Sequence, residues 1–176
     1  FMAGHAEASW RGLETHGLLD ALFPESTPAM LADASGGLRR LLLKALRNTD
    51  ERIREDRPVT PAFLFAALLW PAYTRELAKL QDQGLEIHLA QQRAAARVVM
   101  HQAQRIALPR RVSIPMQEIW MLQARFPERR RKRVFRLLSH PRFRAAYDFL
   151  ELRLEAEPGL SEEFGFWRDA QELSGD

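Results

Sequence analysis

The chain has 176 residues, of which 46% are hydrophobic and 28% are charged, and its formal net charge is +3. These values are typical of a globular protein and exclude a disordered chain. The absence of cysteine excludes disulfides, thiolate metal sites and cysteine nucleophiles, and it fits a reducing compartment. No apolar run reaches the roughly 20 residues that a membrane-spanning helix needs. We therefore expect a cytoplasmic protein without a membrane partner.

Charge is distributed unevenly along the chain. Residues 1–92 contain 10 basic and 12 acidic residues, and residues 145–176 contain 2 basic and 9 acidic residues. Residues 93–144 contain 14 basic residues and only 2 acidic ones. A positive block of this size attracts polyanions. We divide the chain into a helical portion, 1–92, an arginine-rich helical portion, 93–154, and an acidic C-terminal tail, 155–176.

The first half predicts only helices, because Ala, Leu, Arg and Glu are frequent and strand-like alternation is rare. The first three expected helices cover roughly residues 6–22, 28–34 and 38–47. Residues 48–57 mix both charge signs, which favours an exposed helix end with surface ion pairs. Thr60 and Pro61 suit the N-cap and first position of a helix whose residues 63–70 are apolar on every side. We expect this helix to be central and buried, and Pro71 to kink or end it.

A long helix is expected over residues 86–108. Its apolar positions predict an inward face made of Leu89, Ala96, Val99, Met100, Ala103 and Ile106. Arg93, Arg97 and Arg105 recur at multiples of four residues on another face. These three arginines are secondary candidates for binding a polyanion.

Two further helices flank the most basic stretch, one over residues 113–126 and one beginning near residue 142. Their apolar stripes are Ile119, Trp120 and Leu122 in the first, and Phe143, Ala146, Tyr147, Leu150 and Leu154 in the second. We interpret the aromatic residues Trp120, Phe126, Phe143 and Tyr147 as core rather than as groups that stack on bases, because they share helical spacing with other apolar residues. The sequence as a whole predicts an all-α protein, an irregular multi-helix bundle.

The stretch ERRRKRVFRLLS, residues 128–139, contains five consecutive cations. On a helix the cations that share one face are Arg129, Lys132, Arg133 and Arg136. Val134, Leu137 and Leu138 lie on the opposite face, and Phe135 lies at the border of that face. Like charges three or four residues apart repel by roughly 0.2–0.5 kcal/mol per pair, and the helix dipole disfavours cations at its N-terminus. We expect an external polyanion to offset this cost.

Arginine predominates in this region, and Arg110, Arg111, Arg142 and Arg144 add to it. Guanidinium groups bind phosphate oxygens in pairs and stack on bases, which favours single-stranded nucleic acid as the partner. A second hypothesis is a protein-interaction module whose cationic face binds an acidic partner or the acidic tail of the same chain. The alternative without a partner is a solvated basic face, partly neutralised by the acidic tail folding back. A self-sufficient enzyme is a further interpretation, which needs a carboxylate site that the sequence does not show.

Motifs for catalysis are missing from the sequence. It has no HExxH pattern, no glycine-rich phosphate loop and no closely spaced pair of aspartates for two metal ions. We therefore expect no catalytic residue and no metal site in this chain.

The chain resembles the C-terminal part of bacterial poly(A) polymerases, namely the helical neck and body and the arginine-rich region. The segments that carry the resemblance are GHAEASWRGLETHGLLDALFP (4–24), NTDERIREDRPVTPAFLFAALLW (48–70), RIALPRRVSIPMQEIWMLQARF (105–126) and HPRFRAAYDFLELR (140–153). The resemblance leaves out residues 155–176. It implies an enzyme that uses ATP and Mg to add AMP to RNA 3′ ends, in mRNA polyadenylation and RNA decay.

In that family the chemistry belongs to a nucleotidyltransferase head, which the resemblance places before Phe1. The resemblance therefore implies two partners, this head and the 3′ region of a single-stranded RNA, and transfers no catalytic or ATP-binding residue to this chain. It transfers RNA binding, and the candidate residues are those that the charge pattern indicates: Arg110, Arg111, Arg129, Lys132, Arg133, Arg136, Arg142 and Arg144.

Overall fold

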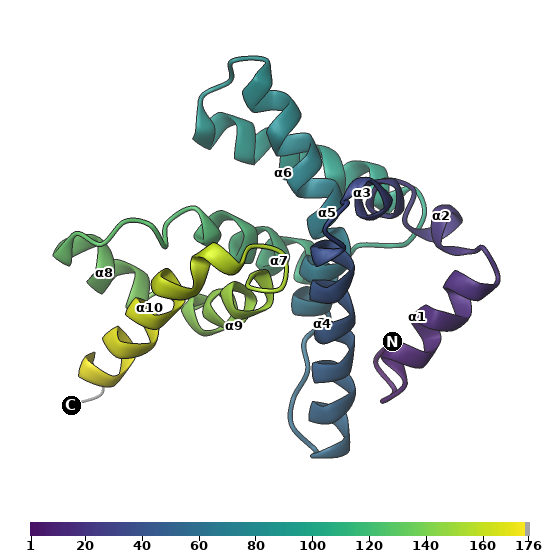
Figure 1. Ribbon diagram of the computed structural model, residues 1–176, viewed down its shortest axis with the longest axis horizontal. Helices are drawn as coiled ribbons and strands as arrows, with labels where there is room; N and C mark the ends of the chain where they lie inside the picture. Colours follow the sequence, from purple (N-terminus) through teal and green to yellow (C-terminus); the bar gives the residue numbers. More distant parts are fainter. Residues whose placement is uncertain (175–176) are drawn as a thin grey trace.

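The computed structural model describes residues 1–174, and this part of the chain is helical without a β-strand. The helices are α1 (Ala6–Thr15), α2 (Leu19–Leu22), α3 (Ser26–Ala32), α4 (Gly37–Arg54), α5 (Pro61–Asp82), α6 (Ile87–Ala103), α7 (Arg110–Gln123), α8 (Arg131–Leu138), α9 (Phe143–Arg153), the short 3₁₀ helix η1 (Pro158–Leu160) and α10 (Ser161–Ser174) (Figure 1). The predicted all-α, irregular bundle is confirmed. Within this range, no helix combines the length and the apolar character that a membrane crossing requires.

Helix α5 is the centre of the fold. It contacts α3, α4, α6, α7 and α9, and all its residues from Ala66 to Tyr73 are buried. A helix that is apolar on every side has to be surrounded in this way. Pro71 lies inside α5 and does not end it, while Thr60 occupies the N-cap position without a side-chain capping hydrogen bond.

Two expected helix boundaries in the first half were wrong. The predicted helix over residues 6–22 is divided by Gly17, whose φ of +65° is the left-handed conformation that glycine adopts without strain. Hydrogen bonds from the N–H of Leu18 to the carbonyl of Leu13, 2.9 Å, and from Gly17 to Glu14, 3.1 Å, end α1 there. The helix expected to end at residue 47 continues as α4 to residue 54.

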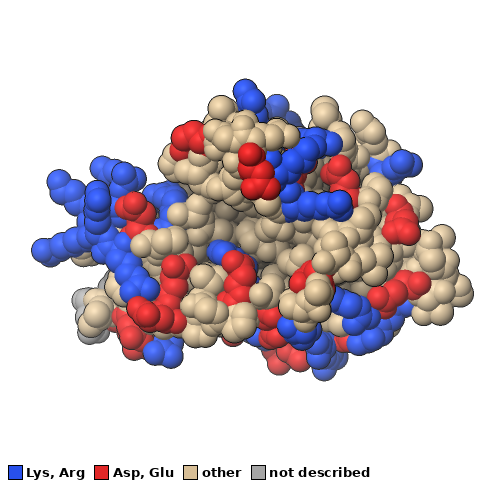
Figure 2. Space-filling model, turned by 45° about the horizontal axis from the view of Figure 1, so that its top comes forward, with Lys and Arg blue, Asp and Glu red and all other residues tan. Residues whose placement is uncertain are grey.

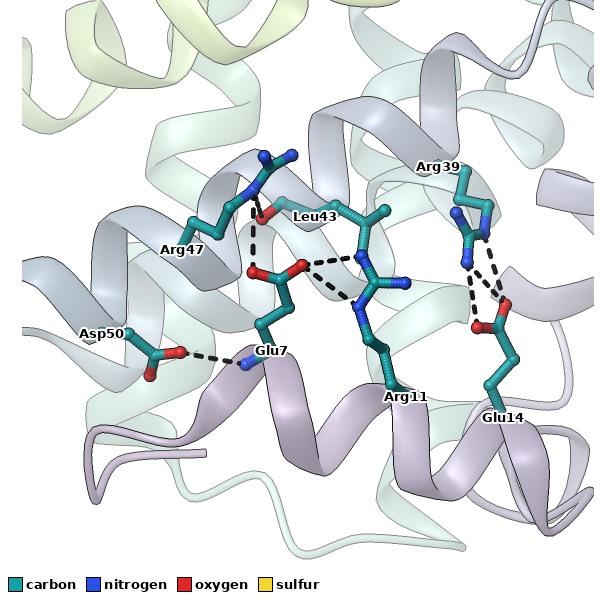
Figure 3. Close-up of polar contacts among 7 residues, drawn as sticks. All are labelled: Glu7, Arg11, Glu14, Arg39, Leu43, Arg47 and Asp50. Carbon is teal, nitrogen blue, oxygen red and sulfur yellow. Dashed lines mark hydrogen bonds and ion pairs between the residues drawn. The ribbon is translucent and has the colours of Figure 1, made fainter.

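Polar contacts fasten α1 to α4 (Figure 3). The carboxylate of Asp50 accepts hydrogen bonds from the N–H groups of Ala6, 2.6 Å, and Glu7, 3.1 Å, so a side chain of α4 caps the start of α1. Farther along, Arg39 of α4 forms an ion pair with Glu14 of α1 at 2.9 Å. Asp50, expected in a surface ion pair, therefore has a capping role that its sequence neighbours do not reveal.

The buried face of α6 differs from the predicted one. Leu89 and Met100, expected inside, are 41% and 58% exposed. The buried residues are Ala90, Gln91, Ala94, Ala95, Val98 and Gln102. Small side chains let two helix axes approach closely, and α6 turns this alanine-rich face toward the crowded surface of α5.

The hydrophobic residues form two clusters. The larger surrounds α5 and includes Trp120, whereas the second consists of Leu122, Phe126, Leu137, Phe143, Ala146, Tyr147, Leu150 and Trp167. Trp167 of α10 is 0% exposed, and its Nε1 donates a hydrogen bond to the carbonyl of Phe126 at 2.9 Å. The core interpretation of Trp120, Phe126, Phe143 and Tyr147 is thereby confirmed.

The described part of the acidic segment, residues 155–174, contributes η1 and α10 to the second cluster. The fold thus has one core around α5 and a smaller one under α8, α9 and α10. The division of the chain at residues 92 and 154 stays a prediction.

Candidate nucleic-acid interface

Helix α8 begins later than expected, at Arg131, and this changes which cations it presents. Arg130 is its N-cap residue with an extended backbone, and Arg129 precedes the helix. The predicted four-cation helix face was therefore wrong in one member, because Arg129 is not part of α8. Leu137 is buried, and Val134 and Leu138 pack against the second cluster, so the apolar side of α8 lies where the sequence placed it.

The outer side of α8 carries cations without carboxylate partners. Lys132 and Arg136 are exposed, and neither forms an ion pair within residues 1–174; the same holds for Arg130 and Arg131. Arg133 has one long contact, 3.9 Å from Nε to the carboxylate of Glu128. Figure 2 shows Lys and Arg side chains crowded at the end of the molecule where α8 lies in Figure 1. We call Lys132, Arg133 and Arg136 the α8 cations.

Three other candidates are held by carboxylates at the surface. The pairs are Arg129 with Glu162 at 3.0 Å, Arg142 with Glu118 at 2.9 Å and Arg144 with Asp148 at 3.2 Å. The side chains of the three arginines are nevertheless 40%, 44% and 74% exposed. Exposed ion pairs stabilise a fold by about 0–1 kcal/mol, so a phosphate can take the place of Glu162 or Glu118 at little cost.

Two of these pairs involve aromatic rings as well. The guanidinium of Arg129 lies 5.0 Å from the centroid of the Phe166 ring, and that of Arg144 lies 5.6 Å from the Tyr147 ring. Burial raises the pKa of Asp148, and the nearby Arg144 opposes that rise. Arg144 therefore has a second task, which is to stabilise a carboxylate that is partly removed from water.

Arg110 and Arg111 lie apart from α8. They begin α7, whereas the chain leads to α8 from the other end of that 14-residue helix, a separation of about 20 Å along its axis. Both side chains are exposed and make no ion pair within the described range. The structure does not join them to the α8 cations in one continuous patch.

The secondary candidates belong to another part of the molecule. Arg93 and Arg97 lie on α6 and Arg105 just after it, and α6 projects away from α8 in Figure 1. Arg97 forms an ion pair with Glu76 of α5 at 3.0 Å, which leaves Arg93 and Arg105 exposed without an ionic partner in residues 1–174. RNA contact by any of the candidate residues stays a prediction.

A cavity of about 510 Å³ lies between α5, α6, α7 and α10, and its lining is more acidic than basic. Asp33, Glu157 and Glu163 line it together with a single cation, Arg153. The Nε of Arg153 donates a hydrogen bond to the carboxylate of Glu157 at 3.0 Å, and its guanidinium lies 5.4 Å from the centroid of the Trp70 ring. The one cation of the cavity lining is therefore already paired. Burial raises the pKa of Glu163. This chemistry does not suit the phosphates of a nucleotide.

Residues 1–174 contain no group of three or more His, Asp or Glu side chains placed to hold a metal ion. The residues present thus do not fit the Mg that the family resemblance implies for the parent enzyme. No catalytic step is assigned to this chain.

One exposed residue of α8 was missed by the sequence interpretation. Phe135, expected at the border of the apolar face, is 54% exposed. Its ring centroid lies 5.9 Å from the guanidinium of Arg131, one turn earlier. Helical spacing places Phe135 about 60° from both Lys132 and Leu138, so the angle alone could not decide between the cationic and the apolar side.

Comparison with known proteins agrees with the placement of the basic segment. Residues 83–176 match a family model described as the polymerase A arginine-rich C-terminus, and the match includes residues 155–176, which the sequence resemblance had left out. Proteins named poly(A) polymerase I are similar to the chain: that of Escherichia coli O6:H1 is 38% identical over 156 residues, 88% of this chain and 34% of the relative. The protein of Salmonella typhimurium is 36% identical over 156 residues, which are 88% of this chain and 34% of that relative. The protein of Haemophilus influenzae is 32% identical over 166 residues, which are 94% of this chain and 37% of that relative.

The chain therefore spans about a third of the length of the curated relatives that it matches. Helices α6 to α10, with the α8 cations and the second cluster, all lie inside the segment that the family model covers. The chain belongs to the family of poly(A) polymerases with an arginine-rich C-terminus.

Proposed function

We propose that this chain is the RNA-holding C-terminal portion of a poly(A) polymerase, and that the outer side of α8 binds the 3′ region of a single-stranded RNA. One observation carries the proposal. The outer side of α8 gathers exposed cations, and Lys132 and Arg136 have no ionic partner in residues 1–174. Like charges on one short helix repel each other, and a polyphosphate backbone removes that cost.

The parent activity that we propose is the transfer of AMP from ATP to RNA 3′ ends, for polyadenylation and decay of mRNA in the cytoplasm. The relatives that share this segment are named poly(A) polymerase I and are about three times as long as the part that matches. We assign catalysis, ATP and Mg to a nucleotidyltransferase head elsewhere in such a protein. The present chain then supplies affinity for RNA.

The α8 cations favour contacts with the RNA backbone rather than with base edges. Guanidinium forks match phosphate oxygens, and a partner held by phosphates is bound with little sequence preference. Arg129, Arg142 and Arg144 extend the surface on either side of α8 if they release their carboxylates. The exposed ion pairs of Arg129 and Arg142 make such an exchange inexpensive, whereas release of Arg144 would leave the partly buried Asp148 without its cation.

The first prediction tests this face. Replacing the α8 cations together by glutamine removes three charges, and at roughly 0.7 per phosphate contact the log–log salt slope for oligoadenylate binding should flatten by about 2. Binding isotherms at several salt concentrations measure the slope. The matched control replaces Arg11, Arg39 and Arg47, three cations of α1 and α4 that are paired with carboxylates, by glutamine.

The control variant has the same net charge and should keep the original slope. Equal flattening in both variants would show that binding follows net charge rather than the α8 face. A slope unchanged in the α8 variant would reject this face as the RNA-binding surface.

The contact between Arg129 and Glu162 supports a second candidate function, a protein-interaction surface for acidic segments. It joins the basic stretch to the acidic segment of the same chain, although it does not reach Lys132 or Arg136. Competition with polyglutamate of equal charge separates the two candidates. An RNA-binding face should prefer oligoadenylate, whereas an acidic-protein site should bind polyglutamate at least as tightly.

A further inference from the structure

We infer that Phe135 forms a base-stacking subsite on the outer side of α8, where its ring packs on one unpaired nucleobase of the bound RNA. This inference rests on the proposed function and adds to it the residue that separates single-stranded RNA from a polyanion without bases. Stacking on aromatic side chains is a general means of holding unpaired bases without selecting among them.

The exposure of Phe135 is exceptional in this protein. Its side chain is 54% exposed, whereas every other aromatic side chain in residues 1–174 is buried or half-buried. All four tryptophans and both tyrosines are buried. The other aromatic rings lie in or against the two hydrophobic clusters. Phe135 stays in water, so the protein does not gain the free energy that burial of this ring would give.

The surroundings of Phe135 indicate what covers it. On α8 the ring lies about 60° from the unpaired Lys132, about 100° from Arg136 and about 160° from Arg133, so it borders the cationic side next to Lys132. Arg131, one turn earlier, has its guanidinium 5.9 Å from the ring centroid. An occupant of this surface therefore meets positive charge and a flat apolar ring within one helical turn. A nucleotide offers a phosphate and a flat base in the same compact unit.

Other occupants match the surface less well. A membrane-binding helix presents several apolar side chains to the lipid, whereas the outer side of α8 offers Phe135 alone, and Leu137 is buried. An acidic protein segment would satisfy the cations and leave the ring without a flat partner. Charge and shape together favour single-stranded RNA.

The second prediction separates stacking from charge in the full chain. Phe135→Leu keeps an apolar side chain and the net charge but removes the ring. We expect oligoadenylate affinity to fall about five- to tenfold, the lower end of what one stacked base contributes. The salt slope should not change, and affinity for inorganic polyphosphate, which has charge but no bases, should also not change. Phe135→Trp should retain oligoadenylate affinity.

Met100→Leu is the matched control, because Met100 is 58% exposed and lies on α6, away from α8. It should leave both affinities unchanged. If Phe135→Leu weakens both ligands alike, or weakens neither, the stacking subsite is overturned. It is also overturned if the substitution lowers binding to anionic phospholipid vesicles while oligoadenylate binding persists.

The outcomes distinguish this inference from the proposed function. Loss of oligoadenylate binding on neutralising the α8 cations, with no effect of Phe135→Leu, removes the subsite and leaves RNA binding by charge. A full chain that does not bind oligoadenylate removes both.

Discussion

Helices α4 and α8 both carry several cations, but their environments differ. Along α4, Arg39 pairs with Glu14 at 2.9 Å, and Lys44 pairs at 3.4 Å with Glu155, a residue far along the chain. On α8, Lys132 and Arg136 have no such partner within residues 1–174. The number of arginines in a helix therefore does not identify a binding surface. The proposed RNA-binding surface rests instead on a group of cations that are exposed and close together on one helix, two of them without an ionic partner in residues 1–174.

The two helices also rest on different cores. Helix α4 contributes Leu41, Leu42 and Leu46 to the large cluster around α5, whereas α8 contributes Leu137 to the smaller one. A small core with a strongly charged helix on its surface depends on each of its large side chains. The predictions below test that difference, beginning with the small core itself.

The third prediction, and the largest expected effect on stability, concerns Trp167. Its indole is 0% exposed and contacts the rings of Phe126 and Phe143 at centroid distances of 5.4 and 5.9 Å. Trp167→Ala should lower the free energy of unfolding by about 3–5 kcal/mol, because it leaves a cavity and an unpaired carbonyl at Phe126. Urea titration followed by circular dichroism measures the loss.

Leu173→Ala on the same helix α10 is the control, since Leu173 is 83% exposed and should change stability by less than about 0.5 kcal/mol. If Trp167→Ala costs no more than this control, α10 is not part of the core.

The burial of Trp167 also means that deleting residues 155–176 does not test whether the acidic tail binds the cationic face. The deletion would damage the core under α8 whether or not the acidic segment competes with RNA.

The sequence was sufficient for the parts of the structure that depend on local pattern. The core roles of Trp120 and Phe143 and the apolar side of α8 follow from helical periodicity, and the structure confirms them. The burial of α5, also confirmed, follows from its unbroken apolar run. The inward face of α6 does not follow from periodicity, because both of its sides carry apolar residues. Close packing against α5 selected the face with small side chains.

The electrostatic pairing of the surface could not be predicted, because it depends on contacts between distant residues. Arg129 pairs with Glu162 and Arg142 pairs with Glu118. The partners in each pair come from different segments of the chain, so spacing along one helix does not predict them. The sequence located the basic block but not the cations that stay free within it. Starting α8 at Arg131 rather than at residue 128 was enough to take Arg129 off the helix.

The fourth prediction addresses the joint between the regions of α4 and α9. Gly37, in the first turn of α4, is buried where a Cβ atom would lie 2.6 Å from the Cα of Ala156 and 3.0 Å from the carbonyl oxygen of Glu155. Both neighbours are backbone atoms and cannot rotate away. Gly37→Ala should therefore destabilise the protein by about 1–3 kcal/mol, measured by urea or thermal unfolding.

Gly165→Ala in α10 is the matched substitution, because a Cβ atom there meets nothing within 4 Å. It should stabilise the protein by roughly 0.5–1 kcal/mol through helix propensity alone. The opposite signs of the two substitutions distinguish a steric joint from a general preference for alanine in helices. A Gly37→Ala protein as stable as the parent would mean that the joint can shift at no cost.

The fifth prediction concerns Asp33, whose carboxylate accepts hydrogen bonds from nearby residues at the start of α4 and takes no part in the proposed RNA surface. It accepts hydrogen bonds from the N–H groups of Leu38, 2.8 Å, and Ser35, 3.1 Å, and these bonds lower its pKa below the usual value. Because the pKa is lower in the folded state, the stabilisation is complete above the ordinary aspartate pKa of 3.8 that the unfolded chain has. It is lost as the pH falls through the folded value.

Asp33→Asn should cost about 1 kcal/mol at pH 7, as the loss of a helix cap does, and the difference from the parent should shrink below about pH 4. Asp20→Asn is the control, since the side chain of Asp20 is exposed and makes no hydrogen bond or ion pair in residues 1–174. Neither substitution should alter the salt slope for oligoadenylate. The carboxylate of Asp33 already accepts hydrogen bonds from Ser35 and Leu38, whereas Lys132 and Arg136 have no carboxylate partner in residues 1–174. A change in RNA binding in the Asp33→Asn protein would contradict this separation.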